Sequence, residues 1–225
     1  YQQLTAGAAR YVLAVSWQPA FCEGRSRLPE CRSQTRQRFD ASHFTLHGLW
    51  PQPRSKAYCG VPETVVRKDK DRRWHDLPWD RLDQATWRRL QKVMPGTRSG
   101  LHKHEWIKHG TCYDGKGAHE YFSDSLYLVD RLNASEVRTL FASRIGSELD
   151  GSEIRAAFDR SFGPGAGERV RIACKNDQDR RLIVELTIGL SGTISPDSKM
   201  SDLMAASSRT DPGCPSGVVD AVGLQ

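Results

Sequence analysis

The residues of this chain best suited to chemistry gather in one segment, which reads His-Glu-Trp-Ile-Lys-His-Gly-Thr-Cys from position 104 to position 112. On a helix, with about 100° between successive residues, the side chains of His104, Glu105, Lys108 and His109 share one face. Two imidazoles, a carboxylate and an ammonium can transfer protons near neutral pH and bind the negative charge of a phosphate. The segment therefore favours phosphoryl chemistry that needs no metal.

Two other interpretations of this segment stay open. A zinc-protease helix, His-Glu-x-x-His, needs its second histidine at position 108, but Lys108 stands there and His109 lies about 140° further round the helix than His104. The second alternative is a solvated polar face that ends at Gly110, since runs of charge are usually exposed. Two histidines that flank a Glu and a Lys favour the catalytic interpretation.

Composition predicts one domain with an anionic partner. The chain has 225 residues and a mass of 25.3 kDa, enough for one well-cored domain over residues 1–225. Its 33 Lys and Arg residues against 27 Asp and Glu give a formal charge of +6 and a pI near 9.1, which favours a polyanion such as nucleic acid. No apolar run approaches the ~18 residues of a membrane span, so no membrane partner is expected. A monomer is the default expectation.

The cysteines indicate an oxidising compartment. An even number of them, six, is spread along the chain without a CxxC pair or zinc-ribbon spacing, a pattern typical of three disulfides. The chain begins at Tyr1 with no charged-then-apolar leader, so we expect a mature periplasmic or secreted form whose signal peptide has been removed. Asn133 begins a glycosylation sequon, which matters only in a eukaryotic secretory host. The cysteines, whose pairing spacing alone leaves open, are Cys22, Cys31, Cys59, Cys112, Cys174 and Cys214.

Two short runs rich in β-forming residues are predicted strands that must position the chemistry. The first covers residues 11–17, and the second covers residues 44–51 and carries His47 near its end. Gly48 allows close approach of backbone or ligand, and Pro51 ends the strand. A single histidine in an apolar strand is more often structural than catalytic, so His47 becomes a candidate only together with residues 104–112.

These two segments together resemble the two signature segments of the ribonuclease T-two family of acid, cyclising endoribonucleases, in particular its bacterial, periplasmic ribonuclease I-like branch. The first strand and the cysteine placement are similar too, while the likeness is looser beyond residue 115. By this resemblance Cys59 would pair with Cys112, Cys174 with Cys214, and Cys22 with Cys31. The residues that carry the match are Phe44-Thr45-Leu46-His47-Gly48-Leu49-Trp50-Pro51 and His104-Glu105-Trp106-Ile107-Lys108-His109-Gly110-Thr111-Cys112.

The resemblance implies a cofactor-free endoribonuclease that cleaves single-stranded RNA by transesterification to a 2′,3′-cyclic phosphate and then hydrolyses it to a 3′-phosphate. It makes His109 the general base and His47 the general acid, labels that stay open because the roles exchange in the second step. His104 would bind phosphate, while Lys108 and Glu105 would stabilise the transition state. RNA cleavage needs such a set: a base for the 2′-OH, an acid for the leaving oxygen and cationic support for the phosphorane.

Base recognition in such a site should rest on stacking, which tolerates any base. Trp50 belongs to the signature, and some family members stack a base there, although core packing is an equal alternative for this residue. Tyr58 lies at a suitable distance along the chain to join it. Gln52 and Leu101 stand where some members carry an Asp and an aromatic residue that read bases. Low base specificity is therefore expected.

Two other classes of function stay open. One is an RNA-binding or signalling protein with a vestigial nuclease site, against which the five intact catalytic candidates argue. The other is a metal-dependent hydrolase, which would lose activity in the presence of a chelator.

The rest of the chain predicts an α+β fold, with several helices packed around a central, mostly antiparallel β-sheet that carries His47 and is stapled by disulfides. Residues 58–80 are highly charged and are expected to form a mobile surface loop. Residues 200–225 are expected to be a tail held by Cys214. Four further histidines, His43, His75, His102 and His119, are expected at the surface. Helices are predicted over 83–94, 118–132, 135–145 and 152–162, and a hairpin over 170–174 and 182–188 with its turn at 176–179.

Overall fold

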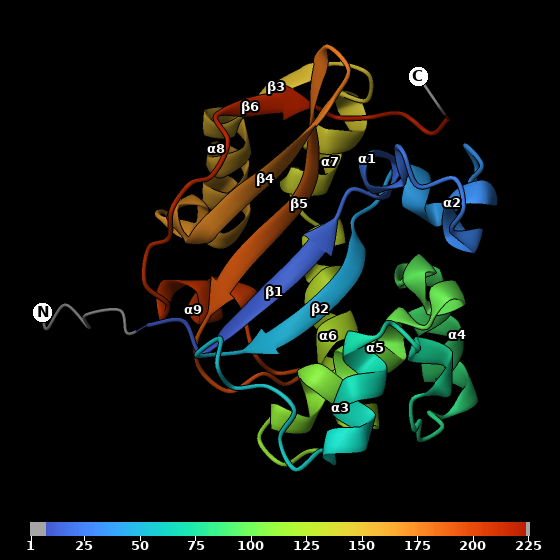
Figure 1. Ribbon diagram of the computed structural model, residues 1–225. Helices are drawn as coiled ribbons and strands as arrows, with labels where there is room; N and C mark the ends of the chain where they lie inside the picture. Colours follow the sequence, from blue (N-terminus) through green and yellow to red (C-terminus); the bar gives the residue numbers. More distant parts are fainter. Residues whose placement is uncertain (1–7, 224–225) are drawn as a thin grey trace, which may run out of the picture.

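The computed structural model describes residues 8–223, in which the strands form one six-stranded mixed sheet (Figure 1). Its order is β2-β1-β5-β6-β3, and β4 pairs with β5 outside this path. The pairs are antiparallel except β5 with β6, so the prediction of a mostly antiparallel α+β sheet is confirmed. The strands are β1 (Tyr11–Ser16), β2 (Thr45–Pro51), β3 (Glu148–Asp150), β4 (Val170–Asp177), β5 (Arg180–Leu190) and β6 (Ser216–Val218).

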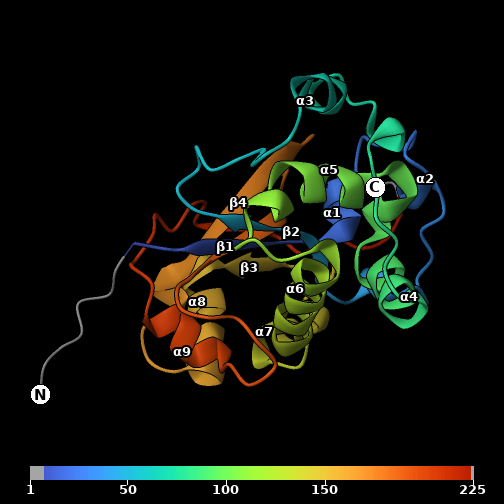
Figure 2. The same cartoon turned by 90° about the horizontal axis from the view of Figure 1, so that it is seen from below.

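Helices cover both faces of the sheet. Figure 2 shows α6 to α9 on one side of the strands and α3 and α5 on the other. The predicted helices after residue 83 are present with small shifts of their ends. The helices are α1 (Gln18–Cys22), α2 (Pro29–Arg32), α3 (Glu63–Lys70), α4 (Gln84–Val93), α5 (Leu101–Lys108), α6 (Ala118–Asn133), α7 (Glu136–Ser143), α8 (Gly151–Phe162) and α9 (Met200–Ala205).

Local signals in the sequence set these helix ends. The Asp83 carboxylate accepts a hydrogen bond from the Thr86 backbone N–H at 2.8 Å and caps α4 as predicted. Ser135 caps α7 in the same way. Helix α8 begins earlier than Ser152, because Asp150 and Glu153 form a reciprocal capping box that satisfies its first N–H groups.

A buried core joins the sheet to α6 and α7 and fixes the strand that carries His47. Trp17, Phe44 and Phe141 pack with ring centroids 4.7–5.5 Å apart. The last residue of α6, Asn133, donates from its side-chain amide to the Phe44 carbonyl at 3.0 Å and accepts from the Phe44 N–H at 2.9 Å. The sequon amide thus ties α6 to the start of β2.

The three predicted disulfides are confirmed. Cys22 bonds to Cys31, and Cys174 on β4 bonds to Cys214 ahead of β6. The third disulfide joins Cys59, ahead of α3, to Cys112, which ends the 3₁₀ turn Gly110–Cys112 after α5. This bond holds the charged 58–80 segment to the end of α5.

The prediction of irregular structure is wrong for two segments. Residues 58–80 contain α3 and a 3₁₀ turn, Trp74–Asp76, because Val66 and Asp69 form a narrow buried face that the surrounding exposed charges conceal in the sequence. The 200–225 segment contains α9 and β6, and its last two residues lie outside the described range.

Among the four histidines expected at the surface, His102 is the exception. His75 and His119 are exposed and His43 is half-buried, but His102 is only 5% exposed. It lies on α5 and packs against the rings of Trp79 and Trp87, with centroids 4.7 and 5.0 Å away. Burial, with smaller contributions from nearby positive charges, lowers the pKa of His102 to about 4.

Candidate active site

A β-bulge in β2 presents His47. Ala14 of β1 pairs with Gly48 and Val15 pairs with Leu46, so His47 is the extra residue of the longer strand. Gly48 lies directly against α5: a Cβ atom added there would be 2.0 Å from Oε2 of Glu105. Glycine at this position therefore allows β2 and α5 to approach closely enough for His47 and Glu105 to meet.

His47 lies between two carboxylates. Its Nδ1 is 2.6 Å from Oε2 of Glu185 on β5, and its Nε2 is 3.5 Å from Oε1 of Glu105. Burial lowers the pKa of His47, but the Glu185 hydrogen bond and the charges of both carboxylates outweigh it and raise the pKa to about 9. With this pKa the imidazole is charged at neutral pH, and because 34% of the side chain is exposed it is accessible to substrate.

Glu105 lies at the centre of the site with 1% of its side chain exposed. One oxygen, Oε2, accepts a hydrogen bond from the indole N–H of Trp50 at 2.8 Å. The other, Oε1, lies 3.5 Å from Nε2 of His47 and 3.8 Å from Nε2 of His104. Burial raises the pKa of Glu105, while the two imidazoles and the indole counter this shift. The carboxylate therefore fixes Trp50 and faces both histidines at once.

His104 is held by residues of the segment expected to be a loop. Its Nδ1 lies 2.6 Å from Oδ1 of Asp69 on α3, and the hydroxyl of Tyr58 donates to Oδ2 of the same carboxylate at 2.6 Å. Trp74 stacks on the imidazole with ring centroids 4.6 Å apart and an interplanar angle of 18°. The position of His104 is thus defined at one nitrogen and over one face.

His109 differs from the other two histidines because it meets no carboxylate among the described residues. It follows the last turn of α5, and its ring centroid lies 5.5 Å from Trp50 and 6.4 Å from His104. Burial, followed by the positive charges of Lys108, His104 and His47, lowers the pKa of His109 to about 3. Its imidazole is therefore neutral at pH 7.

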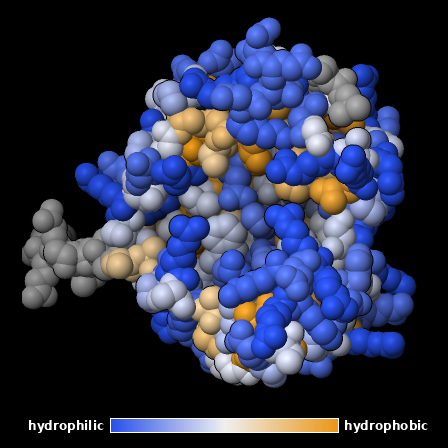
Figure 3. Space-filling view, viewed as in Figure 1, coloured by the Kyte–Doolittle hydropathy of each residue, from blue (hydrophilic) through white to orange (hydrophobic). Residues whose placement is uncertain are grey.

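A cavity of about 260 Å³ opens beside His47 and Glu185. Its apolar walls include Phe21, Trp74 and Leu101, which come from three separate segments of the chain. Figure 3 shows this face of the molecule hollowed along its middle, with mainly hydrophilic residues around the hollow. The cavity is large enough for an aromatic ring system next to the imidazole.

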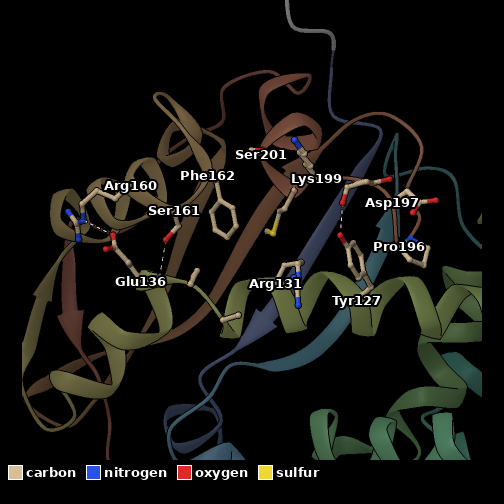
Figure 4. Close-up of a pocket in the computed structure, with 14 residues that line it drawn as sticks. Tyr127, Arg131, Glu136, Arg160, Ser161, Phe162, Pro196, Asp197, Lys199 and Ser201 are labelled. Carbon is tan, nitrogen blue, oxygen red and sulfur yellow. Dashed lines mark hydrogen bonds and ion pairs between the residues drawn. The ribbon is translucent and has the colours of Figure 1, made fainter.

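A larger cavity of about 640 Å³ lies elsewhere, among α6, α8 and the residues before α9 (Figure 4). Arg160 pairs with Glu136 at one end, and Tyr127 donates a hydrogen bond to the Ser198 carbonyl at the other. None of the five predicted catalytic residues lines this cavity. We therefore assign the candidate site by its ionisable groups and not by volume.

Residues 8–223 contain no group of three or more His, Cys, Asp or Glu side chains arranged to hold a metal ion. No helix in this range has the length and apolar character needed to cross a bilayer.

The structure brings His47, His104, Glu105 and His109 together. Trp50 contacts two of these histidines, His47 and His109. It also adds Glu185, Asp69 and Trp74, which the sequence analysis missed. Glu185 did carry a signal, since it is a lone carboxylate in the apolar 182–188 run. Asp69 carried none, because it is one of several acidic and basic residues in a single charged stretch.

Comparisons with known proteins give the same family as the signature segments. The family model described as "Ribonuclease T2 family" matches residues 9–202. Ribonuclease I of Escherichia coli (strain K12) is 30% identical over 223 residues, which cover 86% of this chain and 80% of that protein. Ribonuclease S-2 of Nicotiana alata is 32% identical over 142 residues, 56% of this chain and 55% of that protein.

Solved structures show the same fold at lower identity. RNase NT, crystallised in complex with 5′-AMP, superposes with a TM-score of 0.56 at 16% identity, covering 97% of this chain and 98% of that one. Trichomaglin, described as an S-like ribonuclease, gives a TM-score of 0.57 at 16% identity, covering 96% and 100%. Since the family model spans most of the sequence and the fold agrees, this chain belongs to the Ribonuclease T2 family.

Proposed function

We propose that this protein is an endoribonuclease that cleaves single-stranded RNA without a metal, through a 2′,3′-cyclic phosphate that it then hydrolyses to a 3′-phosphate. One observation carries the proposal: two histidines that contact the same Trp50 ring have pKa values shifted in opposite directions, His47 to about 9 and His109 to about 3. At neutral pH one is an acid and the other a base, which is the pair that the reaction needs.

In the first step, neutral His109 takes the proton from the ribose 2′-OH, and the oxygen attacks the adjacent phosphorus. Protonated His47 gives its proton to the departing 5′-oxygen as the P–O bond breaks. In the second step water replaces the lost nucleotide, so His47, now neutral, acts as the base and His109 acts as the acid. The enzyme returns to its starting protonation state.

Three further groups are assigned to the phosphate. His104 donates a hydrogen bond to a phosphate oxygen, and the Lys108 ammonium balances the charge that develops on the phosphorane. Glu105 keeps both imidazoles and the Trp50 ring in place through its two oxygens. DNA lacks the 2′-OH nucleophile and should bind without being cut.

Base recognition by stacking supports broad specificity. Trp50 and Tyr58 remain the predicted contacts for the base on the 5′ side of the cut, with the Tyr58 hydroxyl already engaged by Asp69. We place the leaving nucleotide in the cavity beside His47, between the apolar walls supplied by Phe21, Trp74 and Leu101. Stacking surfaces of this kind tolerate any base.

The three disulfides favour a periplasmic or secreted setting, where they persist. We propose a single-domain monomer that degrades RNA there.

The first test is metal-free cleavage. The protein is incubated in EDTA with a short single-stranded RNA and with the matching DNA, and mass spectrometry identifies the ends. We expect early 2′,3′-cyclic phosphate, later 3′-phosphate and intact DNA. The His47→Ala variant, purified identically, controls for contaminating nuclease and should be about 10²–10⁴-fold slower, as is usual for loss of a general acid. Cleavage that requires added metal would refute the proposal.

A further inference from the structure

We propose that Asp69 is a positioning residue of this site: it holds Nδ1 of His104 so that Nε2 of the ring faces the substrate phosphate. The inference rests on the proposed function, because it deepens the phosphate-binding role given to His104. Asp69 lies outside both signature segments, residues 44–51 and 104–112.

The Asp69 carboxylate is buried and both of its oxygens have hydrogen-bond partners. The side chain is 1% exposed on a helix whose other charged residues are at the surface or half-buried. Each oxygen has one partner at 2.6 Å, Nδ1 of His104 for Oδ1 and the Tyr58 hydroxyl for Oδ2. A buried carboxylate without such partners is strongly unfavourable, so the arrangement requires His104 as a donor.

The same segment also fixes the plane of the His104 ring. Trp74 stacks on the ring, and its indole N–H donates to the Asp69 backbone carbonyl at 3.3 Å. Asp69 therefore holds an edge of the imidazole while Trp74 covers a face. With rotation blocked at both places, Nε2 points toward Glu105, 3.8 Å away, at the centre of the site.

Asp69 supplies a charged acceptor for the Nδ1 edge of His104. Burial raises the pKa of Asp69, but the hydrogen bonds from His104 and Tyr58 outweigh burial and lower the pKa below its ordinary value. The group is therefore a carboxylate at neutral pH. A carboxylate that accepts from Nδ1 fixes which nitrogen of the ring faces the substrate. Nδ1 is then used by Asp69, and Nε2 is the nitrogen directed to the centre of the site. Glu185 stands in the same relation to His47, from a different strand.

The test compares Asp69→Asn with Asp71→Asn, a matched control that removes the same charge from an exposed residue two positions away. Calorimetry measures the Kd for inorganic phosphate, and kinetics separate KM from kcat on a dinucleotide. Asp69→Asn should weaken phosphate binding and raise KM about 10- to 100-fold, the value of a charge-assisted hydrogen bond. The kcat value should change less, because the proton-transfer pair His47 and His109 is not altered.

Each outcome separates the two proposals. Equal phosphate Kd values for Asp69→Asn and Asp71→Asn at pH 7 would overturn the role of Asp69 while leaving the ribonuclease function standing. A lower Tm with unchanged phosphate Kd and KM would mean that Asp69 only fastens α3 to α5. If the wild-type protein fails to cut RNA while Asp69→Asn still weakens phosphate binding relative to Asp71→Asn, the function fails and the positioning role stands.

A measurement on the wild-type protein covers the case in which Asp69→Asn does not fold. In NMR spectra, the Nδ1 proton of His104 should be protected from exchange and strongly downfield, as a proton shared with a buried carboxylate is. A His104 ring with no observable Nδ1 proton would contradict the inference.

Discussion

Three histidines share this site, and their Nδ1 atoms have different hydrogen-bond partners. Nδ1 of His47 faces Glu185 and Nδ1 of His104 faces Asp69, each at 2.6 Å. Nδ1 of His109 is buried and has no hydrogen-bond partner among the described residues. His47 and His109 thus acquire opposite pKa shifts from their surroundings. The carboxylates that hold Nδ1 of His47 and of His104 both lie outside the signature segments.

The pH dependence of the reaction should follow from these contacts. Activity should rise with pH as His109 loses its proton at about pH 3 and fall as His47 loses its proton at about pH 9, which leaves a broad plateau. Glu185→Gln removes the main support of the protonated His47, so the alkaline limb of kcat/KM should move down toward pH 6.5, the ordinary value for histidine. The loss should therefore be larger at pH 8 than at pH 5. An unmoved alkaline limb would rule out His47 as the acid.

At the scale of elements, the site depends on the close contact of one strand with one helix. β2 supplies His47 and Trp50, and α5 supplies Glu105, with Gly48 as the point of closest approach. A Cβ atom at position 48 would lie 2.0 Å from Oε2 of Glu105 and 2.5 Å from Nε1 of Trp50. No rotamer change of a flexible chain end can relieve both contacts, because the two groups are hydrogen-bonded to each other.

Gly48→Ala should therefore damage both activity and stability. Displacement of Glu105 by about 1 Å should lower kcat/KM about 100-fold. Overpacking should cost about 1–3 kcal/mol of unfolding free energy, visible as a lower Tm in calorimetry. Gly117→Ala is the matched control, since a Cβ atom there meets nothing within 4 Å. A Gly48→Ala protein with wild-type activity would show that the contact does not matter.

The elements also show where sequence reasoning succeeds. The strands around residues 11–17 and 44–51, the hairpin and the helices from residue 83 onward follow from alternation, periodicity and caps, which are local. Helix α3 escapes detection because only Val66 and Asp69 of its eight residues are buried. The carboxylate partners of His47 and His104 are not predicted for another reason. Which residues meet depends on how segments far apart in the sequence pack and pair, and no local sequence pattern encodes this.

At the scale of the whole molecule, net charge should govern encounter with RNA. The formal charge of +6 is spread over a chain whose substrate is a polyanion, so binding should release counterions. Single-stranded DNA, which lacks the nucleophile, allows affinity to be measured without cleavage. Its Kd should rise about tenfold between 50 and 200 mM salt if the protein neutralises about two or three phosphates. Affinity that is independent of salt would exclude this role of the basic residues.

The hydrogen bond between His47 and Glu185 joins residues 138 positions apart. During synthesis, both signature segments leave the ribosome long before β5, so a nascent chain contains all five predicted catalytic residues while His47 still lacks its carboxylate. His47 also lacks this carboxylate in any molecule in which β5 has not yet paired with β1. Pairing of β5 with β1 is therefore the step that brings Glu185 to His47 and raises the pKa of this imidazole. Completion of the sheet thus extends the pH range over which His47 is an acid.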